Sequence, residues 1–264
     1  MKKILCLVVA IVSLLAFAGC GGHAPKANAP GHQESRTEKV LRVGTDADYP
    51  PFEYYQEATK SYIGFDIELI QGAAREAGYS KVEFVDLEFN NLLPSLKDGQ
   101  VDAVISCMNI TDERRAVADF TEPYLNSANV AVAPAGTKPG SIEAMKGKRV
   151  AVEIGSIHVG QAKEISDTII ECGDAEEALK LVADNKADFA IMDNYTARFF
   201  ITNFYNGKLA IMTEMKDSKD EGIAVAVAKG NKELRDKLNE GLQKYQTTAA
   251  FLQMKKTYFG KLEG

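Results

Sequence analysis

The sequence predicts an α/β protein whose folded body consists of two similar lobes. From Val40 onward, short strand-like runs alternate with amphipathic helical patterns, which is typical of βαβ units and mainly parallel sheets. The stretch Leu96–Ile105 is nearly copied at Val182–Ile191, where each copy reads as a helix end, a Gly or Asn turn, an Asp and a buried strand. Chance reuse of a common connection is the alternative. A content of 45% hydrophobic and 26% charged residues is typical of a globular chain.

In the first lobe, Asp66 is expected to cap a helix whose apolar face begins at Ile67 and which ends at Gly78. A second helix should stop at Gly99, because Gly readily adopts the left-handed conformation that ends helices. The strands of this lobe are expected at Leu41–Gly44, Lys81–Val85 and Asp102–Ser106, and the second helix at Asn91–Asp98.

The same pattern returns in the second lobe. Two short segments with small or β-branched residues, Ser127–Val132 and Gly222–Val227, are candidate hinge strands between the lobes. Lobe 1 would then comprise residues 39–127 and 225–264, and lobe 2 residues 128–224. The elements expected in the later part of the chain are strands Arg149–Glu153, Thr168–Glu171 and Asp188–Met192, helices Ser156–Ser166 and Asp174–Asn185, and two final helices on lobe 1 at about Lys232–Gln246 and Ala249–Tyr258.

Residues 1–19 have the features of a signal peptide. Lys2 and Lys3 precede an apolar run from Ile4 to Ala18, which is shorter than the ~20 residues that span a bilayer. A buried core helix is the alternative, and the polar segment that follows argues against it. The run Leu15–Cys20 resembles the bacterial lipobox, which implies that Cys20 is lipidated; an ordinary secreted form is the alternative.

Residues 20–38 then read as a flexible tether, because they lack apolar periodicity. Cleavage after residue 19 removes two lysines and no acidic residue, which changes the formal net charge from −6 to −8. The expected location is extracytoplasmic, in the periplasm or at the cell surface, with the lipid as the membrane anchor.

Other classes of function have little support in the sequence. The chain has no long basic run, so we expect no nucleic-acid partner. Three scattered histidines do not form a metal-ligand pattern, and no Gly-rich phosphate loop is present, so neither a metal nor a cofactor is expected. Cys107 and Cys172 are expected to be free thiols, since a bridge between them would pin the lobes together.

The two copies of the repeated stretch predict a binding cleft. Ser106 and Cys107, which end one copy, correspond to Met192 and Asp193 in the other. Ligands of open α/β sheets bind beyond the carboxyl ends of the strands. A cleft between the lobes would therefore collect these polar strand ends.

Four ordered motifs resemble those of the family-3 solute-binding proteins, and together they fall within Val40–Gly260. They are Thr45–Glu53, Gly64–Leu69, Ile110–Arg115 and Asp119–Tyr124. The resemblance implies a two-lobed periplasmic-binding-protein-like fold of type II, with hinge strands that join the lobes. It implies a monomeric, non-enzymatic receptor that binds a polar L-amino acid and delivers it to the permease subunits of an ABC importer.

The resemblance also implies the main contacts of the ligand. Arg114, in a helix that Thr111 caps, would clamp the α-carboxylate with two parallel N–H donors. Asp193 would hold the α-ammonium group. A surface ion pair is the alternative role for Arg114, and a helix cap for Asp193, where both roles could hold together.

Further residues are expected around the ligand's side chain and the strand ends. Tyr49 and Phe89 match aromatic positions that sandwich the side chain, with core packing as the alternative. Glu153 could accept a cationic head group or be a solvated strand end, and His158 could be a polar contact or a surface residue. The remaining candidates are Asp46, Ser106, Cys107, Asn109 and Ser156.

The aromatic pair with Asp46 and Glu153 favours arginine or lysine, while glutamine, histidine and cystine remain open. Two rival functions use the same fold. One is an enzyme that resembles cyclohexadienyl or arogenate dehydratases, with Glu153 or Asp193 as general acid. The other is a ligand-sensing partner of a membrane receptor.

Overall fold

The computed structural model describes residues 38–138, 140, 142–215 and 221–262. The predicted signal peptide, the predicted lipidation site Cys20 and all of the predicted tether before Glu38 lie outside these residues.

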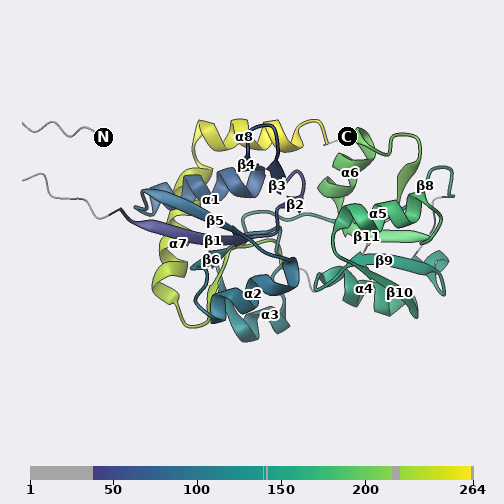
Figure 1. The fold of residues 1–264 in the computed structure, drawn as a ribbon, viewed down its shortest axis with the longest axis horizontal. Helices are drawn as coiled ribbons and strands as arrows, with labels where there is room; N and C mark the ends of the chain where they lie inside the picture. The colour runs from purple at the N-terminus through teal and green to yellow at the C-terminus, as the bar shows by residue number, and fades with distance from the viewer. Residues whose placement is uncertain (1–37, 139, 141, 216–220, 263–264) are drawn as a thin grey trace, which may run out of the picture. The chain divides into compact units, whose positions relative to one another are not determined.

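The first large sheet has the strand order β5–β1–β6–β13–β7. Its strands β5, β1 and β6 are parallel, whereas β13 runs antiparallel to both β6 and β7. In Figure 1, α1 and α8 lie on one side of this sheet, and α2 and α3 lie on the other. The strands are β1 (Val40–Thr45), β5 (Lys81–Asp86), β6 (Ala103–Val104), β7 (Ala118–Phe120) and β13 (Ala226–Ala228), and the helices are α1 (Phe65–Glu76), α2 (Phe89–Lys97), α3 (Asp112–Val117), α7 (Lys232–Gln246) and α8 (Ala249–Phe259).

The second large sheet has the order β10–β9–β11–β8–β12, again with three parallel strands followed by two antiparallel pairings. A small sheet of β2 (Asp48–Tyr49), β3 (Glu53–Gln56) and β4 (Ser61–Ile63) follows β1 in the chain. The elements of the second sheet region are β8 (Asn129–Pro134), η1 (Ile142–Met145), β9 (Arg149–Glu153), α4 (Ile157–Ile165), β10 (Thr168–Cys172), α5 (Ala175–Ala183), β11 (Phe189–Asp193), α6 (Asn194–Asn203) and β12 (Leu209–Glu214).

The predicted α/β class and the two matching sheets are confirmed. Parallel strands form one half of each sheet as expected, and antiparallel strands that the alternation pattern did not predict complete the other half. Apolar side chains of β6, β7 and α2 form one buried cluster, and those of β8, β9 and α4 form another. Burial of these faces is the main favourable contribution to folding.

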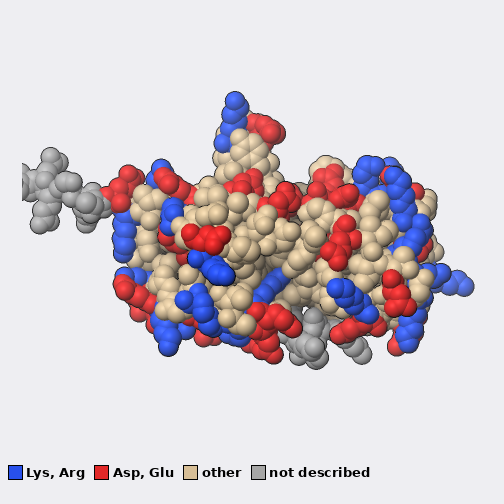
Figure 2. All heavy atoms as spheres, turned by 60° about the horizontal axis from the view of Figure 1, so that its bottom comes forward, with Lys and Arg blue, Asp and Glu red and all other residues tan. Residues whose placement is uncertain are grey.

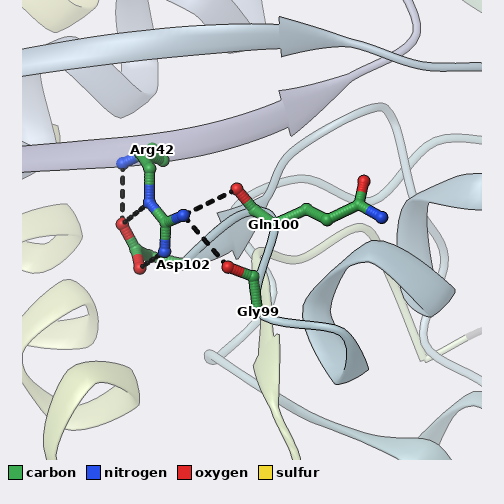
Figure 3. A network of polar contacts seen from close by, with 4 residues as sticks. All are labelled: Arg42, Gly99, Gln100 and Asp102. Carbon is green, nitrogen blue, oxygen red and sulfur yellow. Dashed lines mark hydrogen bonds and ion pairs between the residues drawn. The ribbon is translucent and has the colours of Figure 1, made fainter.

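The internal repeat has a matching set of contacts in the two sheets. In the first, Asp102 accepts hydrogen bonds from the Arg42 backbone N–H at 2.9 Å and from Nη2 at 2.7 Å (Figure 3). In the second, Asp188 accepts the same pair of bonds from Arg149, at 2.8 and 2.9 Å. Each Asp thus joins the turn before one strand to the neighbouring parallel strand. This shared geometry favours two copies of one design over chance reuse of a connection.

The predicted cap of α1 is wrong. The N-cap residue is Gly64, and Asp66 lies within the first turn with its side chain fully buried. Its carboxylate accepts hydrogen bonds from the Cys107 backbone N–H at 2.8 Å and from the Tyr124 hydroxyl at 2.6 Å. The second helix begins at Phe89 instead of Asn91 and contains Pro94 in its interior.

The chain passes between the two large sheets along two segments that lie side by side. Ile223 donates its N–H to the Leu125 carbonyl and accepts the N–H of Tyr124, each at 2.8 Å. The predicted hinge segments overlap the strands that they lead into, since Asn129 already belongs to β8 and Ala226 to β13.

The surface, the helices and the cysteines add one observation each. On the face drawn in Figure 2, acidic and basic side chains are interspersed and are not separated by sign. Among the described residues, no helix is both long and apolar enough to cross a bilayer. Cys107 and Cys172 are both buried free thiols, as the sequence predicts.

Candidate binding site

A cavity of ≈ 310 Å³, counting the solvent at its mouth, lies where β1, β6 and β9 end. This position agrees with the rule that open α/β sheets bind ligands beyond the carboxyl ends of their strands. Ten of the eleven predicted ligand-binding residues line it, and Asp193 does not. Glu53 and Ile157 line it as well, although neither was predicted to. The lining residues are Asp46, Tyr49, Glu53, Phe89, Ser106, Cys107, Asn109, Arg114, Glu153, Ser156, Ile157 and His158.

Arg114 reaches across the cavity from the first lobe to the second. Thr111 caps α3 as predicted, because its hydroxyl accepts the Arg114 N–H at 3.2 Å. The guanidinium donates to the Asn109 carbonyl at 2.7 Å and to the Gly155 carbonyl at 3.1 Å. It also lies over the Phe89 ring, 5.2 Å from its centroid. These contacts fix the plane of a group that has five N–H donors.

Asp193 lies next to the cavity and is joined to it by Tyr49. The Asp193 backbone N–H donates to the Tyr49 hydroxyl at 3.1 Å. Its carboxylate caps α6 by accepting the Tyr195 N–H at 2.7 Å and the Thr196 N–H at 3.4 Å. The cap role that the sequence left open is therefore present, and the carboxylate is fixed at the end of β11.

Ser106 and Cys107 form a turn that is hydrogen-bonded to two buried acids, Glu53 and Asp66. The Ser106 hydroxyl accepts the Asp46 N–H at 3.0 Å and donates to Glu53 Oε1 at 3.1 Å. Cys107 has a φ of 43°, a left-handed conformation that non-glycine residues seldom adopt. Its N–H bond to Asp66 helps to hold the residue in that conformation.

Two buried carboxyl groups from opposite lobes flank the same cavity. Asp46 is 6% exposed, and Glu153 is 5% exposed. Burial is the largest cause that raises the pKa of Asp46, to about 8, and the charge of Asp48 adds to it. Burial also raises the pKa of Glu153 well above its usual range, and the Asp46 charge raises it further. Glu153 is thus no solvated strand end, which rules out that alternative.

The start of α4 supplies the second lobe's remaining contacts. Ser156, the first residue of the predicted helix, occupies the N-cap position of α4, but its hydroxyl donates to the Glu153 carbonyl at 2.7 Å and does not bond a helix N–H. His158 is buried, with Nε2 3.2 Å from Asn129 Oδ1, so it is not a surface residue. Gly155 has a φ of 78°, and a Cβ there would meet the Asn90 Cβ of the first lobe at 3.1 Å.

The two lining residues that the sequence analysis missed had only weak signals. Glu53 is an acid within the aromatic motif Tyr49–Glu53, where an exposed strand position was equally consistent with the pattern. Ile157 has an apolar side chain at the start of a helix, which gives no sign of ligand contact. Their place in the cavity follows from tertiary structure.

The matches to known proteins agree with this geometry. Residues 41–261 match the bacterial extracellular solute-binding proteins, family 3, and the chain belongs to that family. It is 32% identical over 263 residues to the arginine-binding extracellular protein ArtP of Bacillus subtilis (strain 168), with 98% of each chain covered. The family is extracellular, which indicates an extracytoplasmic location for this chain.

Two solved structures are also similar. An ancestral arginine-binding protein bound to arginine has a TM-score of 0.76 and 32% identity, with 84% of this chain and 98% of that chain covered. An ancestral amino acid-binding protein described as a precursor of cyclohexadienyl dehydratase has a TM-score of 0.73 and 30% identity, with 83% and 95% covered. The two-lobed fold of amino-acid receptors is therefore confirmed.

Proposed function

We propose that the cavity reversibly binds a basic L-amino acid, arginine or lysine, which the protein delivers to an ABC importer without chemical change. The observation that carries the proposal is the balance of charge in the cavity. Arg114 is the only arginine or lysine among the described lining residues, whereas Asp46 and Glu153 are carboxylic acids that flank the cavity from opposite lobes. A ligand with one carboxylate and a cationic side chain matches that balance.

The backbone groups of the ligand would bind at two fixed points. The Arg114 guanidinium, oriented by two carbonyls and the Phe89 ring, would present paired donors to the α-carboxylate. Asp193, held by the N-terminal amides of α6, would accept the α-ammonium group. The Tyr49 hydroxyl, which accepts the Asp193 backbone N–H, would keep this residue next to the cavity.

The ligand's side chain would extend towards the acids. Asp46 and Glu153 come from opposite lobes, and the charge of Asp46 acts on Glu153. A guanidinium or ammonium group between them would offset this unfavourable interaction and favour the ionised forms. Tyr49 and Phe89 offer aromatic faces to the aliphatic stem, a contact worth ~0.5–1.5 kcal/mol.

Ligand binding would favour the closed arrangement of the two lobes. Lobe 1 would comprise residues 39–127 and 225–264, and lobe 2 residues 128–224. A ligand that contacts Arg114 in one lobe and Asp193 in the other binds the closed form more tightly than the open one. The Arg114–Gly155 bond, at 3.1 Å, and the Tyr49–Asp193 bond, at 3.1 Å, join the same two lobes. Closure would provide the shape that the transporter's permease subunits recognise.

Calorimetric titration of protein freed of bound ligand with each of the twenty amino acids tests the proposal. We expect arginine or lysine to bind most tightly. Arg114→Met should abolish measurable binding, whereas Arg115→Met is a matched control, because Arg115 pairs with Glu221 and does not line the cavity. Absence of heat with every amino acid would remove the receptor function. Binding of acidic or apolar amino acids alone would remove the basic preference.

A dehydratase is the second candidate function, and one observation favours it. Glu153 is buried, and this burial raises the pKa of its carboxyl well above the usual range, which favours the protonated form that a general acid requires. Incubation with prephenate or arogenate, followed by chromatography of the aromatic product, separates the two functions. We expect no turnover above that of the Glu153→Gln variant.

We further propose that Cys20 carries the lipid that anchors a monomeric receptor to a bacterial membrane. The resemblance of Leu15–Cys20 to a lipobox supports this site. In cells fed a labelled fatty acid, the label should enter the wild-type chain and not the Cys20→Ser variant. Labelling of both chains alike would contradict the proposal.

A further inference from the structure

Two carboxylic acids lie close together beside the cavity, and one of them, Glu53, lines it. Glu53 from β3 and Asp66 from α1 are both 0% exposed and lie within hydrogen-bonding reach of each other. Each uses one oxygen for neighbouring groups. Glu53 Oε1 accepts the Ser106 hydroxyl at 3.1 Å, and Asp66 Oδ2 accepts the Cys107 N–H at 2.8 Å and the Tyr124 hydroxyl at 2.6 Å.

The second oxygen of each acid has no partner outside the pair. Glu53 Oε2 and Asp66 Oδ1 are buried, and no described donor bonds to either of them. Ionised carboxylates are acceptors only, so two of them cannot bond to each other and would repel at this distance. One proton between these two oxygens satisfies both at once. The geometry therefore requires the pair to hold a proton.

The unequal surroundings of the two acids decide which one carries it. Burial raises the pKa of Asp66, to about 6, and the bonds from Tyr124 and Cys107 limit the rise because they stabilise the anion. Glu53 accepts only the Ser106 bond, and burial followed by the Asp66 charge raises its pKa well above the usual range. Glu53 is therefore the better donor of the two, and Asp66 the better acceptor.

We propose that Glu53 is a positioning residue of the amino-acid site, whose proton shared with Asp66 holds the Ser106–Cys107 turn in its ligand-binding shape. Ser106 and Cys107 both line the cavity, and each is bonded to one member of the pair. Loss of the proton would place two anions under the turn. The inference rests on the proposed function, because ligand affinity is its main readout.

The groups that face the pair favour the protonated state. Asp46 follows β1, Cys107 follows β6, and Tyr124 lies against α1. Across the cavity, Glu153 and Asp193 act on the neighbouring Cys107. These groups are acids or become anions on titration, and Arg114 is the cation that lines the same cavity. Any test of the pair must therefore compare two proteins in which these other groups titrate alike.

Three variants separate the shared proton from mere packing. Glu53→Gln keeps both bonds, because its amide can donate to Asp66 and accept from Ser106. We expect its Kd for arginine at pH 7 to stay within about threefold of the wild-type value. Glu53→Met fills the same space without either bond, and its Kd should rise about tenfold or more. Glu57→Gln, on the exposed turn after β3, should change nothing.

The pH profile provides the second readout. An acid whose folded-state pKa is raised contributes stability that is lost as the pH rises through that pKa. The ratio of wild-type Kd to Glu53→Gln Kd should therefore rise as the pH increases from neutral into the alkaline range. Asp46 and Glu153 titrate in both proteins, so their effects cancel in this ratio.

The outcomes are distinct. A Glu53→Met variant that binds like the wild type, or a ratio that stays constant with pH, would overturn the inference. If the wild type binds no amino acid, the proposed function fails instead. The melting temperatures of the same proteins across the same pH range would then decide the shared proton, since Glu53→Gln should lose the alkaline decline of the wild type.

Discussion

Binding of arginine should release protons, and the magnitude follows from Asp46. With a pKa of about 8, its carboxyl is about nine-tenths protonated at pH 7 in the empty site. A ligand cation beside it favours the anion, so binding should release about 0.9 proton from this group at pH 7, with any contribution of Glu153 in addition. Deprotonation of Asp46 costs about 1.4 kcal/mol at pH 7 and only about 0.4 kcal/mol at pH 8. The Kd should fall by about one order of magnitude between pH 6.5 and 8.

Isothermal titration in two buffers measures this release directly. The observed enthalpy should differ between phosphate and Tris by the number of protons released times the difference in their ionisation enthalpies. Asp46→Asn should lower the number by about 0.9 and flatten the rise of affinity with pH. The reasoning would be refuted by an observed enthalpy that is the same in both buffers at pH 7. Glu57→Gln, remote from the cavity, serves as the control.

Three further substitutions test other parts of the site. Arg114→Lys keeps the charge but loses the paired donors, so the Kd measured by titration calorimetry should rise about 100-fold, and a change below tenfold would argue against the clamp. Tyr49→Phe leaves the buried Asp193 N–H without its acceptor, which should cost about 1–3 kcal/mol of arginine affinity; an unchanged Kd would contradict this. Tyr195→Leu removes a ring stacked on Phe259 with centroids 4.3 Å apart, and should lower the melting temperature by about 2–4 °C in calorimetry, whereas no shift would show that the stack is unimportant.

Elements with strong local signals could be predicted from the sequence. The bounds of β9 match the prediction, since Gly147 and Gly155 stand on either side of a short β-branched run. The bounds of α7 match as well, because Asn231 caps the helix and its apolar residues recur at helical spacing. In both segments, the residues that determine the element lie within it or next to it.

Features that depend on distant residues could not be predicted in this way. Asp66 precedes an apolar helical pattern, which is how an N-cap looks in sequence. Its carboxylate instead bonds the N–H of Cys107, 41 positions along the chain. Glu53 lines the cavity and bonds Ser106, 53 positions along the chain, and neither acid's local sequence contains that information. The antiparallel halves of the sheets could not be predicted either. One reason is that β13, near the end of the sequence, pairs with β6, which lies in its first half.

The repeated connection explains why the site has opposite polarity at its two ends. Asp102 and Asp188 fix equivalent strands through Arg42 and Arg149, so Cys107 and Asp193 come to corresponding strand ends. In the first copy the strand leads to a turn in which the Cys107 N–H is bonded to the buried Asp66, and the Arg114 guanidinium lines the same cavity. In the second it runs straight into α6, whose amides hold the Asp193 carboxylate. With Arg114 and Asp193 in the proposed roles, one design offers donors on one side and a carboxylate on the other, and an uncharged solute of the same size would supply a charge to neither.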